Sequence, residues 1–599
     1  MGEKQNRNLR GPGGNMRKYD RIAMVGVLSL GLFLRLWGIG FGLPRVQHAD
    51  ETALIYTAFS MAAEGGRPNV YVHGTVYPSI IAVFSGLYFL WGRLVGWFSD
   101  PSVFLVSFIK DPTVIVMFGR SLTVFFALAS VWLVYRVGRQ LFNARVGLLS
   151  SLFLAVSVLH VKESHYVKPD VLLGFVVLLL FLACLFVSQK RELKHSALAG
   201  ILLGVAVAVK FSALIFFVNV LVVHLLSTNR KGGFSWVQLS RRLVVFLATF
   251  LSTFFVVSPY TFLDFRSFAK NVAWFGNTLA LLEGKPHSPL WYYLFEYLWE
   301  GFGKAIWVLA FLGGVRFLKG KRREGIILLS FPVVFLLSVD FWSKAHVQRY
   351  ILPIVPLFAL LAGWGAEWFF VRLWWLHRRV GALLAVLLLL VLVWQPLMRS
   401  LKFDFMITRQ QTGELSTAWI KDNVASGSRV AIDGRLRPYF FSGSGPYIFP
   451  SGEQLTRELG DLTFRPYYRA LKEATRREPG YEILGTPNLG FAYDVTREAW
   501  DLSAFPKLSS VDYYLEQGVE YIVMSSWANP QPPHRYAWSD EFRKSLEEQY
   551  ELIKRFEPSV EFADDPHIVR MDYAALDRVT LFQRPAVFGP TISVYRRKS

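Results

Sequence analysis

The chain has 599 residues, of which 53% are hydrophobic and 16% aromatic, and this composition excludes a soluble protein and indicates a polytopic α-helical membrane protein. The formal net charge of +21 comes from basic residues that cluster in short loops between apolar runs, so it reports membrane topology and predicts no nucleic-acid partner. The only cysteine, Cys184, lies inside an apolar run, which excludes a disulfide framework and a zinc site built on thiolates.

The N-terminal part of the chain predicts a tail, a first span and a long loop. Residues 1–21 are polar and basic and predict a cytoplasmic tail. Residues 22–43 are too long for a signal-peptide core and lack an A-x-A cleavage site, so we expect a retained helix. Residues 44–113 form the first outer loop. Its apolar stretch 77–98 is interpreted as a helix on the outer surface, or one that re-enters the membrane, because a full span there would place the next basic cluster outside.

Basic clusters orient the remaining helices, because short cytoplasmic loops carry an excess of Lys and Arg. We predict about eleven transmembrane helices, within a range of about 10–13, in a multi-pass protein of the inner or cytoplasmic membrane. The N-terminus is then cytoplasmic and the C-terminal region extracytoplasmic. After the first, the expected spans are 114–135, 146–160, 171–188, 197–209, 211–227, 243–258, 303–318, 325–340, 350–371 and 380–398.

The composition changes after about residue 400, where charged residues and Gly/Pro turns become frequent. Helix-like and strand-like patterns then alternate, which predicts a soluble α/β domain over residues 401–599 on the extracytoplasmic face. Helices are expected at 414–423 and 511–517, and strands at 429–433, 521–525 and 591–596. The sequence shows no internal repeat, no H-E-x-x-H metal motif and no G-x-x-x-x-G-K-[ST] nucleotide loop.

Acidic residues stand where the chain enters and re-enters the outer face. Asp50 and Glu51 follow His48 at the head of the first outer loop, and a charge so close to hydrocarbon often marks function. The alternative is a helix start with Asp50 as its N-cap. Further on, Asp170 follows His165 and falls in the first turn of a helix, where a carboxylate is also favoured as a simple cap. His165 is equally compatible with an ordinary interfacial residue.

Cationic residues are expected on the same side of the membrane. Lys210 interrupts an apolar stretch at the tip of a short hairpin, where it would either bind an anionic lipid phosphate or extend to the interface. His346, Arg349 and Tyr350 precede a late span, and the fixed fork of donors on Arg suits phosphate. The alternative is a cluster that only anchors the span. Acids and cations beside an apolar bundle together suit a substrate with a lipid chain, a phosphate and a polar head.

Taken in order, these motifs resemble a known superfamily. An Asp-Glu pair in the first outer loop, a Ser-His-x4-Asp stretch that opens a later helix, a lysine in a short hairpin and Arg-Tyr-x-Leu-Pro-x-x-Pro at a late span are similar to the GT-C membrane glycosyltransferases. The resemblance is to the branch of protein O-mannosyltransferases and lipid A aminoarabinose transferases. It covers residues 22–400, which we therefore interpret as the catalytic membrane domain.

The resemblance implies an inverting transfer of a hexose or pentose from a polyprenyl-phosphate or dolichyl-phosphate donor to a hydroxyl group on a protein, lipid or glycan acceptor. Asp50 matches the acid that is proposed in the family as the catalytic base. Glu51 and Asp170 would orient acceptor or sugar, and His48 and His165 would bind substrate or assist. The donor phosphate would be bound by Lys210, His346, Arg349 and Tyr350.

Two questions stay open at the level of sequence. No cofactor is required, but a divalent metal is compatible with the family, and its candidate ligands are Asp50, His165 and Asp170. A transporter or flippase of a lipid-linked sugar is the alternative function. A transporter is expected to carry charges near the bilayer midplane in repeated halves, whereas this chain places them at one face.

Overall fold

The computed structural model describes residues 18–598 with internal gaps. The segments outside the description are 1–17, 47, 69, 72–73, 229–234, 281–287, 321, 343–346, 374–377, 433–447, 452–453, 455–469, 471–472, 474–479, 486–492, 495–498, 501–509, 527–539, 561, 563–570, 572, 584–585 and 599.

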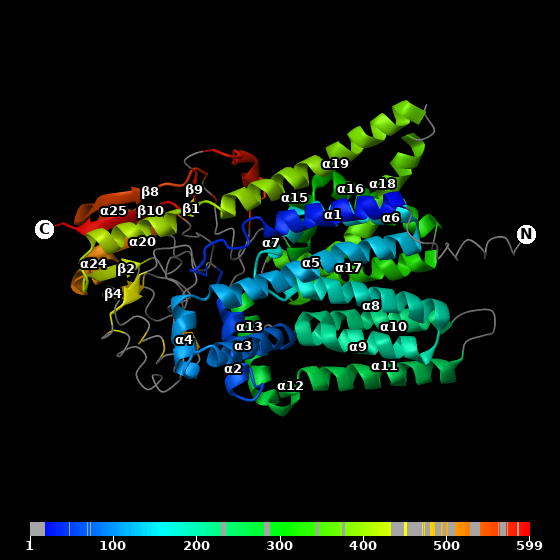
Figure 1. Cartoon of the computed structure of the whole chain (residues 1–599), viewed down its shortest axis with the longest axis horizontal. Coiled ribbons are helices and arrows are strands. Elements are labelled where there is room, and N and C mark those ends of the chain that lie inside the picture. Colours follow the sequence, from blue (N-terminus) through cyan, green and yellow to red (C-terminus); the bar gives the residue numbers. More distant parts are fainter. Residues whose placement is uncertain are drawn as a thin grey trace, which may run out of the picture.

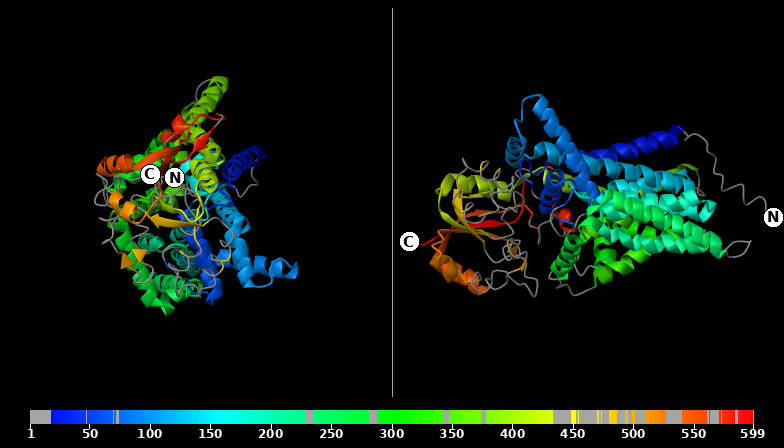
Figure 2. Two further views of the ribbon diagram at one scale, coloured as in Figure 1. Left: turned by 90° about the vertical axis from the view of Figure 1, so that its left-hand side faces the viewer. Right: turned by 90° about the horizontal axis from the view of Figure 1, so that it is seen from below.

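Long helices form a bundle with a mixed α/β domain at one end (Figure 1). We call the end beside that domain the domain end, and the opposite end, where the first helix begins, the far end. The right-hand view of Figure 2, seen from below, shows the same division. The bundle helices are α1 (Lys18–Leu36), α5 (Thr113–Leu141), α6 (Ala144–Val156), α8 (Asp170–Lys190), α9 (Leu193–Val209), α10 (Phe216–Thr228), α11 (Trp236–Val257), α16 (Lys304–Gly320), α17 (Arg322–Trp342), α18 (Val355–Leu373) and α19 (Arg378–Ile407).

Every span expected from the sequence overlaps one of these helices, although α1 ends at Leu36, before the expected limit at residue 43. The prediction of a mostly helical membrane protein is confirmed. In the described part of the chain, five segments are long and apolar enough to cross a membrane: Thr113–Leu141, Asp170–Lys190, Trp236–Val257, Gln348–Leu373 and Arg379–Ile407. Shorter apolar helices, such as α6 and α9, occupy other expected spans. The count of about eleven crossings stays a prediction.

Close helix packing in the bundle relies on small residues, as is common between membrane helices. Helices α16 and α18 meet at Gly313 and Gly365. A Cβ at Gly313 would lie 1.9 Å from the carbonyl oxygen of Leu361, and one at Gly365 would lie 2.1 Å from that of Leu309. Any larger side chain at either position would therefore force the two backbones apart.

Shorter helices cover the domain end of the bundle. The first outer loop contains α2 (Ala49–Ala63), α3 (Val76–Leu94) and α4 (Pro101–Lys110), and α3 falls where a non-spanning helix was expected. The loop is tied to the segment after α11 by an ion pair between Arg67 and Asp264, whose Nη2 and Oδ2 atoms are 2.6 Å apart. The other short elements are α7 (Val158–Glu163), η2 (Phe211–Ile215), α12 (Tyr260–Leu263), α13 (Phe265–Ala280), α14 (Pro289–Tyr292), a π-helical turn (Tyr293–Leu298), α15 (Trp299–Gly301) and η4 (Gln348–Ile354).

The C-terminal domain is built on a mixed six-stranded sheet in the order β3-β4-β2-β7-β10-β8. The pairs from β3 to β7 are parallel, and β10 runs antiparallel to both β7 and β8. The strands are β2 (Arg429–Ile432), β3 (Phe449–Pro450), β4 (Gly480–Gly485), β7 (Tyr521–Ser525), β8 (Tyr550–Phe556) and β10 (Ile592–Arg597), with α20 (Thr412–Asn423), α24 (Val511–Glu516) and α25 (Asp540–Gln549) beside them. The expected helices and strands of this region are therefore present.

Alternation along the strands gives this sheet two apolar faces, because successive strand residues point to opposite sides. Val430 and Ile432 pack in one cluster with Ile420 of α20, whereas Ala431 packs in another with Leu546 of α25. Helices therefore cover both faces of the sheet. Two separate two-stranded pairings lie outside this sheet, one between β1 (Gln410–Gln411) and β9 (Val587–Phe588) and one between β5 (Tyr493–Asp494) and β6 (Ala499–Trp500).

The border between membrane domain and C-terminal domain differs from the expected boundary after residue 400. Helix α19 continues to Ile407, and residues from the C-terminal part of the chain, including Met571, Tyr573 and Leu576, belong to the core of the bundle. We call residues 573–579, together with Met571, the C-terminal strap. Arg399 holds the strap through Asp577, with two contacts of 3.0 and 2.6 Å. The two parts are thus joined by packing as well as by chain connection.

Candidate active site

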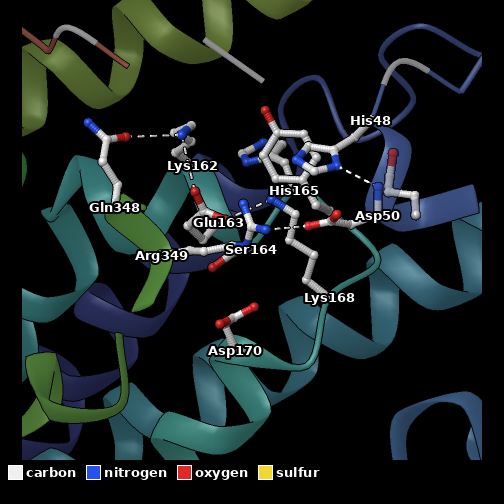
Figure 3. Close-up of polar contacts among 12 residues, drawn as sticks. His48, Asp50, Lys162, Glu163, Ser164, His165, Lys168, Asp170, Gln348 and Arg349 are labelled. Atoms are coloured by element: carbon white, nitrogen blue, oxygen red, sulfur yellow. Dashed lines mark hydrogen bonds and ion pairs between the residues drawn. The ribbon is translucent and has the colours of Figure 1, made fainter. Parts of the chain in front are cut away.

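The first turn of α2 separates the roles of three residues that the sequence had grouped. His48 is the N-cap, because its Nδ1 accepts a hydrogen bond of 3.0 Å from the backbone N–H of Asp50. The alternative in which Asp50 is the cap is therefore wrong. Successive helical residues point about 100° apart, so the side chains of Asp50 and Glu51 diverge. Figure 3 shows Asp50 directed toward Arg349.

Asp50 and Arg349 form an ion pair at the domain end. The Oδ2 atom of Asp50 lies 2.8 Å from Nη2 of Arg349, and the two side chains are 22% and 13% exposed. Arg349 is placed by η4, the short turn that precedes α18. The pair is partly shielded from solvent yet still reachable, which is the environment that a base and a phosphate ligand both require.

A second ion pair lies beside the first. Asp170 is the first residue of α8, and its Oδ1 atom accepts a hydrogen bond of 2.6 Å from Nζ of Lys210. Lys210 follows the last residue of α9 and precedes η2, so the expected position at a hairpin tip is confirmed. The ring centre of Tyr350 lies 4.4 Å from Nζ of Lys210 and 5.5 Å from Cζ of Arg349. Tyr350 therefore lies beside both cations and connects the two pairs.

A close backbone approach keeps the first outer loop against the Lys210 turn. Gly74 has a φ of +68°, and a Cβ there would lie 2.5 Å from the carbonyl oxygens of Ala208 and Val209. The next residue, Thr75, donates its backbone N–H to Ala208 at 2.8 Å. Only glycine fits this contact. The first outer loop, which carries Asp50, is therefore fixed beside Lys210, the partner of Asp170.

Glu51 lies in a different, fully buried place. Both of its oxygens accept hydrogen bonds of 2.9 Å from Arg120, and neither side chain is exposed. Its Oε1 also accepts the backbone N–H of Val167 at 2.8 Å. The expected role of Glu51 as a catalytic residue is not supported by this position. Its contacts instead hold the 160–170 segment against α5.

A buried charge network lies behind the two pairs and was not predicted from the sequence. Glu163 contacts Nζ of Lys162 and Nζ of Lys168, each at 3.1 Å, and all three side chains are 2% exposed or less. Burial disfavours the charged form of Glu163, but Lys168 and Lys162 outweigh burial and hold the pKa of the carboxyl below its usual range. The sequence feature that could have indicated this network is the presence of Lys162, Glu163 and Lys168 between two apolar runs.

The network reaches the C-terminal strap through Gln348, the neighbour of Arg349. The Oε1 atom of Gln348 accepts hydrogen bonds from Nζ of Lys162 at 3.3 Å and from the backbone N–H of Met571 at 2.9 Å. Its Nε2 donates to the carbonyl of Met571 at 2.5 Å. The strap is thus bonded to the residue next to the phosphate-ligand candidate.

Two predicted site residues are not brought into the site. His165 is fully buried, and its ring nitrogens face the carbonyl oxygens of Val161 at 2.9 Å and Trp37 at 3.1 Å. It is therefore directed into the protein, and the predicted assisting role has no support in the geometry. His346 lies outside the described residues.

The candidate metal ligands Asp50, His165 and Asp170 are also separated, because each has a different partner. Among the described residues, no group of three or more His, Cys, Asp or Glu side chains converges in a way that could hold a metal ion. The particular ligand set expected from the sequence is therefore not assembled.

Comparison with known proteins agrees with the resemblance seen in the sequence. Residues 113–260, which include Asp170 and Lys210, match the family model of dolichyl-phosphate-mannose-protein mannosyltransferases. No curated protein sequence matches this chain.

Several solved structures are similar to this chain at low sequence identity. The oligosaccharyltransferase of Archaeoglobus fulgidus in its apo form is 12% identical, with 91% of this chain and 74% of that chain covered and a TM-score of 0.49. ArnT from Cupriavidus metallidurans bound to undecaprenyl phosphate is 15% identical, with coverages of 89% and 96% and a TM-score of 0.44. The protein O-mannosyltransferase Pmt1-Pmt2 complex of S. cerevisiae is 17% identical over 44% and 36%, with a TM-score of 0.33.

Proposed function

We propose that this protein is an inverting glycosyltransferase that moves a sugar from a polyprenyl-phosphate or dolichyl-phosphate donor to an acceptor hydroxyl at the extracytoplasmic membrane face. The observation that carries the proposal is the pair of adjacent ion pairs, Asp50–Arg349 and Asp170–Lys210, at one end of a bundle of apolar helices. The match of residues 113–260 to a family of lipid-phosphate-dependent mannosyltransferases supports it.

The two cations suit the leaving group of such a reaction. When the bond between the anomeric carbon and the phosphate oxygen breaks, the electron pair stays on the lipid phosphate, whose negative charge increases. Arg349 and Lys210 both lie near the ring of Tyr350, where they would stabilise that charge. A guanidinium has five N–H donors, so Arg349 is able to contact a phosphate while it keeps a bond to Asp50.

Asp50 is the proposed base. It would take the proton of the acceptor hydroxyl while the oxygen attacks the anomeric carbon from the face opposite the phosphate, which inverts the configuration. The Arg349 pair keeps Asp50 ionised and thus able to accept a proton. A bound phosphate would share the guanidinium of Arg349 with Asp50, which weakens the stabilisation of the carboxylate and makes it a stronger base. The arrangement therefore favours activation of the acceptor after the donor has bound.

Asp170 is proposed to orient Lys210 and the sugar, because its carboxylate is almost fully buried and bonded to that lysine. Glu51 is assigned a positioning role, since it touches Arg120 and Val167 but no group of the proposed centre. His48 remains a candidate substrate ligand. Its Nδ1 is an acceptor, so the proton of the neutral ring lies on Nε2, which has no hydrogen-bond partner among the described residues.

The full chain, purified in detergent, should transfer label from a radioactive polyprenyl-phosphate hexose or pentose to one of a panel of protein, lipid and glycan acceptors. Asp50→Asn should lower the rate by about 10²–10⁴-fold, as expected for loss of a general base. Glu64→Gln, an exposed acid just after α2, is the matched control and should retain the wild-type rate. Transfer by Asp50→Asn at the wild-type rate would remove Asp50 from its role.

Donor binding tests the phosphate ligands separately. Arg349→Ala and Lys210→Ala should each weaken binding of the labelled donor by about tenfold or more, because a charge-assisted hydrogen bond to phosphate is lost. Binding of the acceptor should change much less. If both substrates were affected equally, these residues would have a general structural role. Movement of the donor across proteoliposome membranes without a transferred product would instead support a transporter.

A further inference from the structure

A group of arginines meets at the far end of the bundle, well away from the proposed active site. Arg191 lies just after α8, with a φ of 60°, Arg242 lies in the second turn of α11, and Arg323 lies in the first turn of α17. The ends of these helices lie together at that end in Figure 1. We call these three residues the arginine cluster.

Two members of the cluster are fixed against the end of α10. Arg242 donates from Nη2 to the hydroxyl of Ser227, and Arg323 donates from Nη2 to the carbonyl of Leu226 at 2.6 Å. Helix α11 lies at the edge of the bundle, and only 17% of its apolar stretch is buried. Arg242 is an exception on this helix, because it is only 4% exposed. Its guanidinium therefore points inward from a helix that borders the lipid.

The charged groups around Arg242 repel its guanidinium. Among the described residues, the charged groups that act on Arg242 are Arg191 and Arg323, and both are cationic. Two buried N–H groups, Nε of Arg242 and Nη2 of Arg191, have no hydrogen-bond partner in the described part of the chain. Two acids are adjacent to members of the cluster along the chain: Glu192, which is paired with Lys194 at 2.5 Å, and Glu324 in the first turn of α17.

Helix ends explain only part of this arrangement. The C-termini of α8 and α10 point at the cluster, and arginine side chains often cap such ends. Each C-terminus carries about half a negative elementary charge, so two of them offset about one positive charge. They do not supply an acceptor for the two buried donors, Nε of Arg242 and Nη2 of Arg191, which bond to nothing described. A buried donor without a partner is costly, which points to an absent acceptor.

We propose that the arginine cluster binds a phosphate anion. Arg forks match phosphate oxygens, and basic pockets between membrane helices bind the head groups of anionic lipids. Because α11 borders the lipid, a phosphate diester of an anionic membrane lipid is able to reach Arg242 from the side. Free inorganic phosphate has the same chemistry and would reach it from the adjacent aqueous phase. Neither ligand takes part in the proposed sugar transfer, so this site is independent of the active site.

The full chain in a neutral detergent should be examined by native mass spectrometry and thermal unfolding with phosphatidylglycerol, phosphatidylcholine or inorganic phosphate. Phosphatidylglycerol should bind and raise the unfolding temperature more than phosphatidylcholine does. Arg242→Gln should weaken that binding by about tenfold. Arg241→Gln is the matched control, because it removes the same charge from the adjacent, exposed position of α11 and should leave binding unchanged.

The variants decide between a built site and general attraction. Equal loss of binding in Arg242→Gln and Arg241→Gln would overturn the proposal, as would a wild-type protein that binds no phosphate-bearing anion. Binding of inorganic phosphate but not of the lipid, with the same dependence on Arg242, supports the site and assigns the soluble source. If Arg242→Gln does not fold, Arg191→Gln, which is less buried, tests the same prediction.

Discussion

The two ends of the bundle use cationic side chains in different ways. At the domain end, Arg349 and Lys210 each lie within 2.8 Å of a carboxylate oxygen. At the far end, Arg242 has two other arginines as its charged neighbours. Acids paired with cations provide both a proton acceptor and a phosphate ligand, which a group-transfer reaction needs at once. An arginine whose charged neighbours are other arginines provides a binding site for an anion and no proton acceptor.

Two ion pairs near the domain end also differ from each other in burial. The Asp50–Arg349 pair is partly exposed, whereas Glu51 and Arg120 are completely buried and bonded to backbone as well as to each other. A buried pair adds little net stability, but loss of one partner leaves a buried charge that is very costly. Glu51 and Arg120 are therefore expected to affect folding before they affect catalysis.

The largest expected effect is on stability, from Glu51→Gln. The change leaves the Arg120 guanidinium buried without its counter-charge and should lower the free energy of unfolding by about 3–5 kcal/mol. Thermal unfolding of the detergent-purified protein measures the loss. Asp50→Asn, at the preceding residue of the same helix turn, should change stability far less, because the Asp50–Arg349 pair is partly exposed to solvent. Similar losses in the two variants would contradict the division between positioning and catalytic acids.

Much of the domain end could be predicted from the sequence, because charged residues beside apolar runs are energetically unfavourable and therefore few. Asp50, Asp170, Lys210 and Arg349 come from four distant segments, and the structure brings all four together. Helix positions followed from hydropathy and basic loops, and the strands of the C-terminal domain followed from alternation. These signals are local or depend on composition.

What could not be predicted depends on partners that are distant in sequence. Glu51 was grouped with Asp50 because they are adjacent, but its partner Arg120 is 69 positions away and lies in an apolar helix. The Gln348 contact crosses 223 positions to Met571, in a segment with no recognisable motif. Nor does any local pattern show that Lys162, Glu163 and Lys168 form a closed network. Such pairings become visible only when the helices are packed.

The next effect concerns the connection between the C-terminal strap and the active site. Gln348→Ala removes both hydrogen bonds to Met571 and leaves backbone groups buried without partners, which should cost about 1–3 kcal/mol. Because Arg349 is the adjacent residue, the Michaelis constant for the donor should rise more than the turnover number falls. Gln348→Glu keeps the acceptor oxygen and loses the donor, so an intermediate effect is expected. Unchanged donor kinetics in Gln348→Ala would mean that the strap only stabilises the fold.

The smallest expected effect is a change in pH dependence at His48. Burial, followed by the charge of Lys168, holds the pKa of this imidazole well below its ordinary value of 6.5. The unfolded chain therefore takes up a proton as the pH falls through 6.5, while the folded protein does not, and stability is lost in the window between 6.5 and the lowered folded pKa. Above that window His48 is neutral in both states and contributes no pH dependence.

His48→Asn keeps a side-chain acceptor at the N-cap of α2 but removes the titrating group. Unfolding temperatures measured from about pH 8 down to about pH 5 should therefore fall less steeply for the variant than for the wild type. Near the upper end the two proteins should differ only slightly, because asparagine is among the best N-cap residues. Parallel curves would mean that His48 becomes protonated in the folded protein, in which case its Nε2 could not be assigned as the donor of a neutral ring. A shallower curve for the variant would support an imidazole that stays neutral in the folded protein.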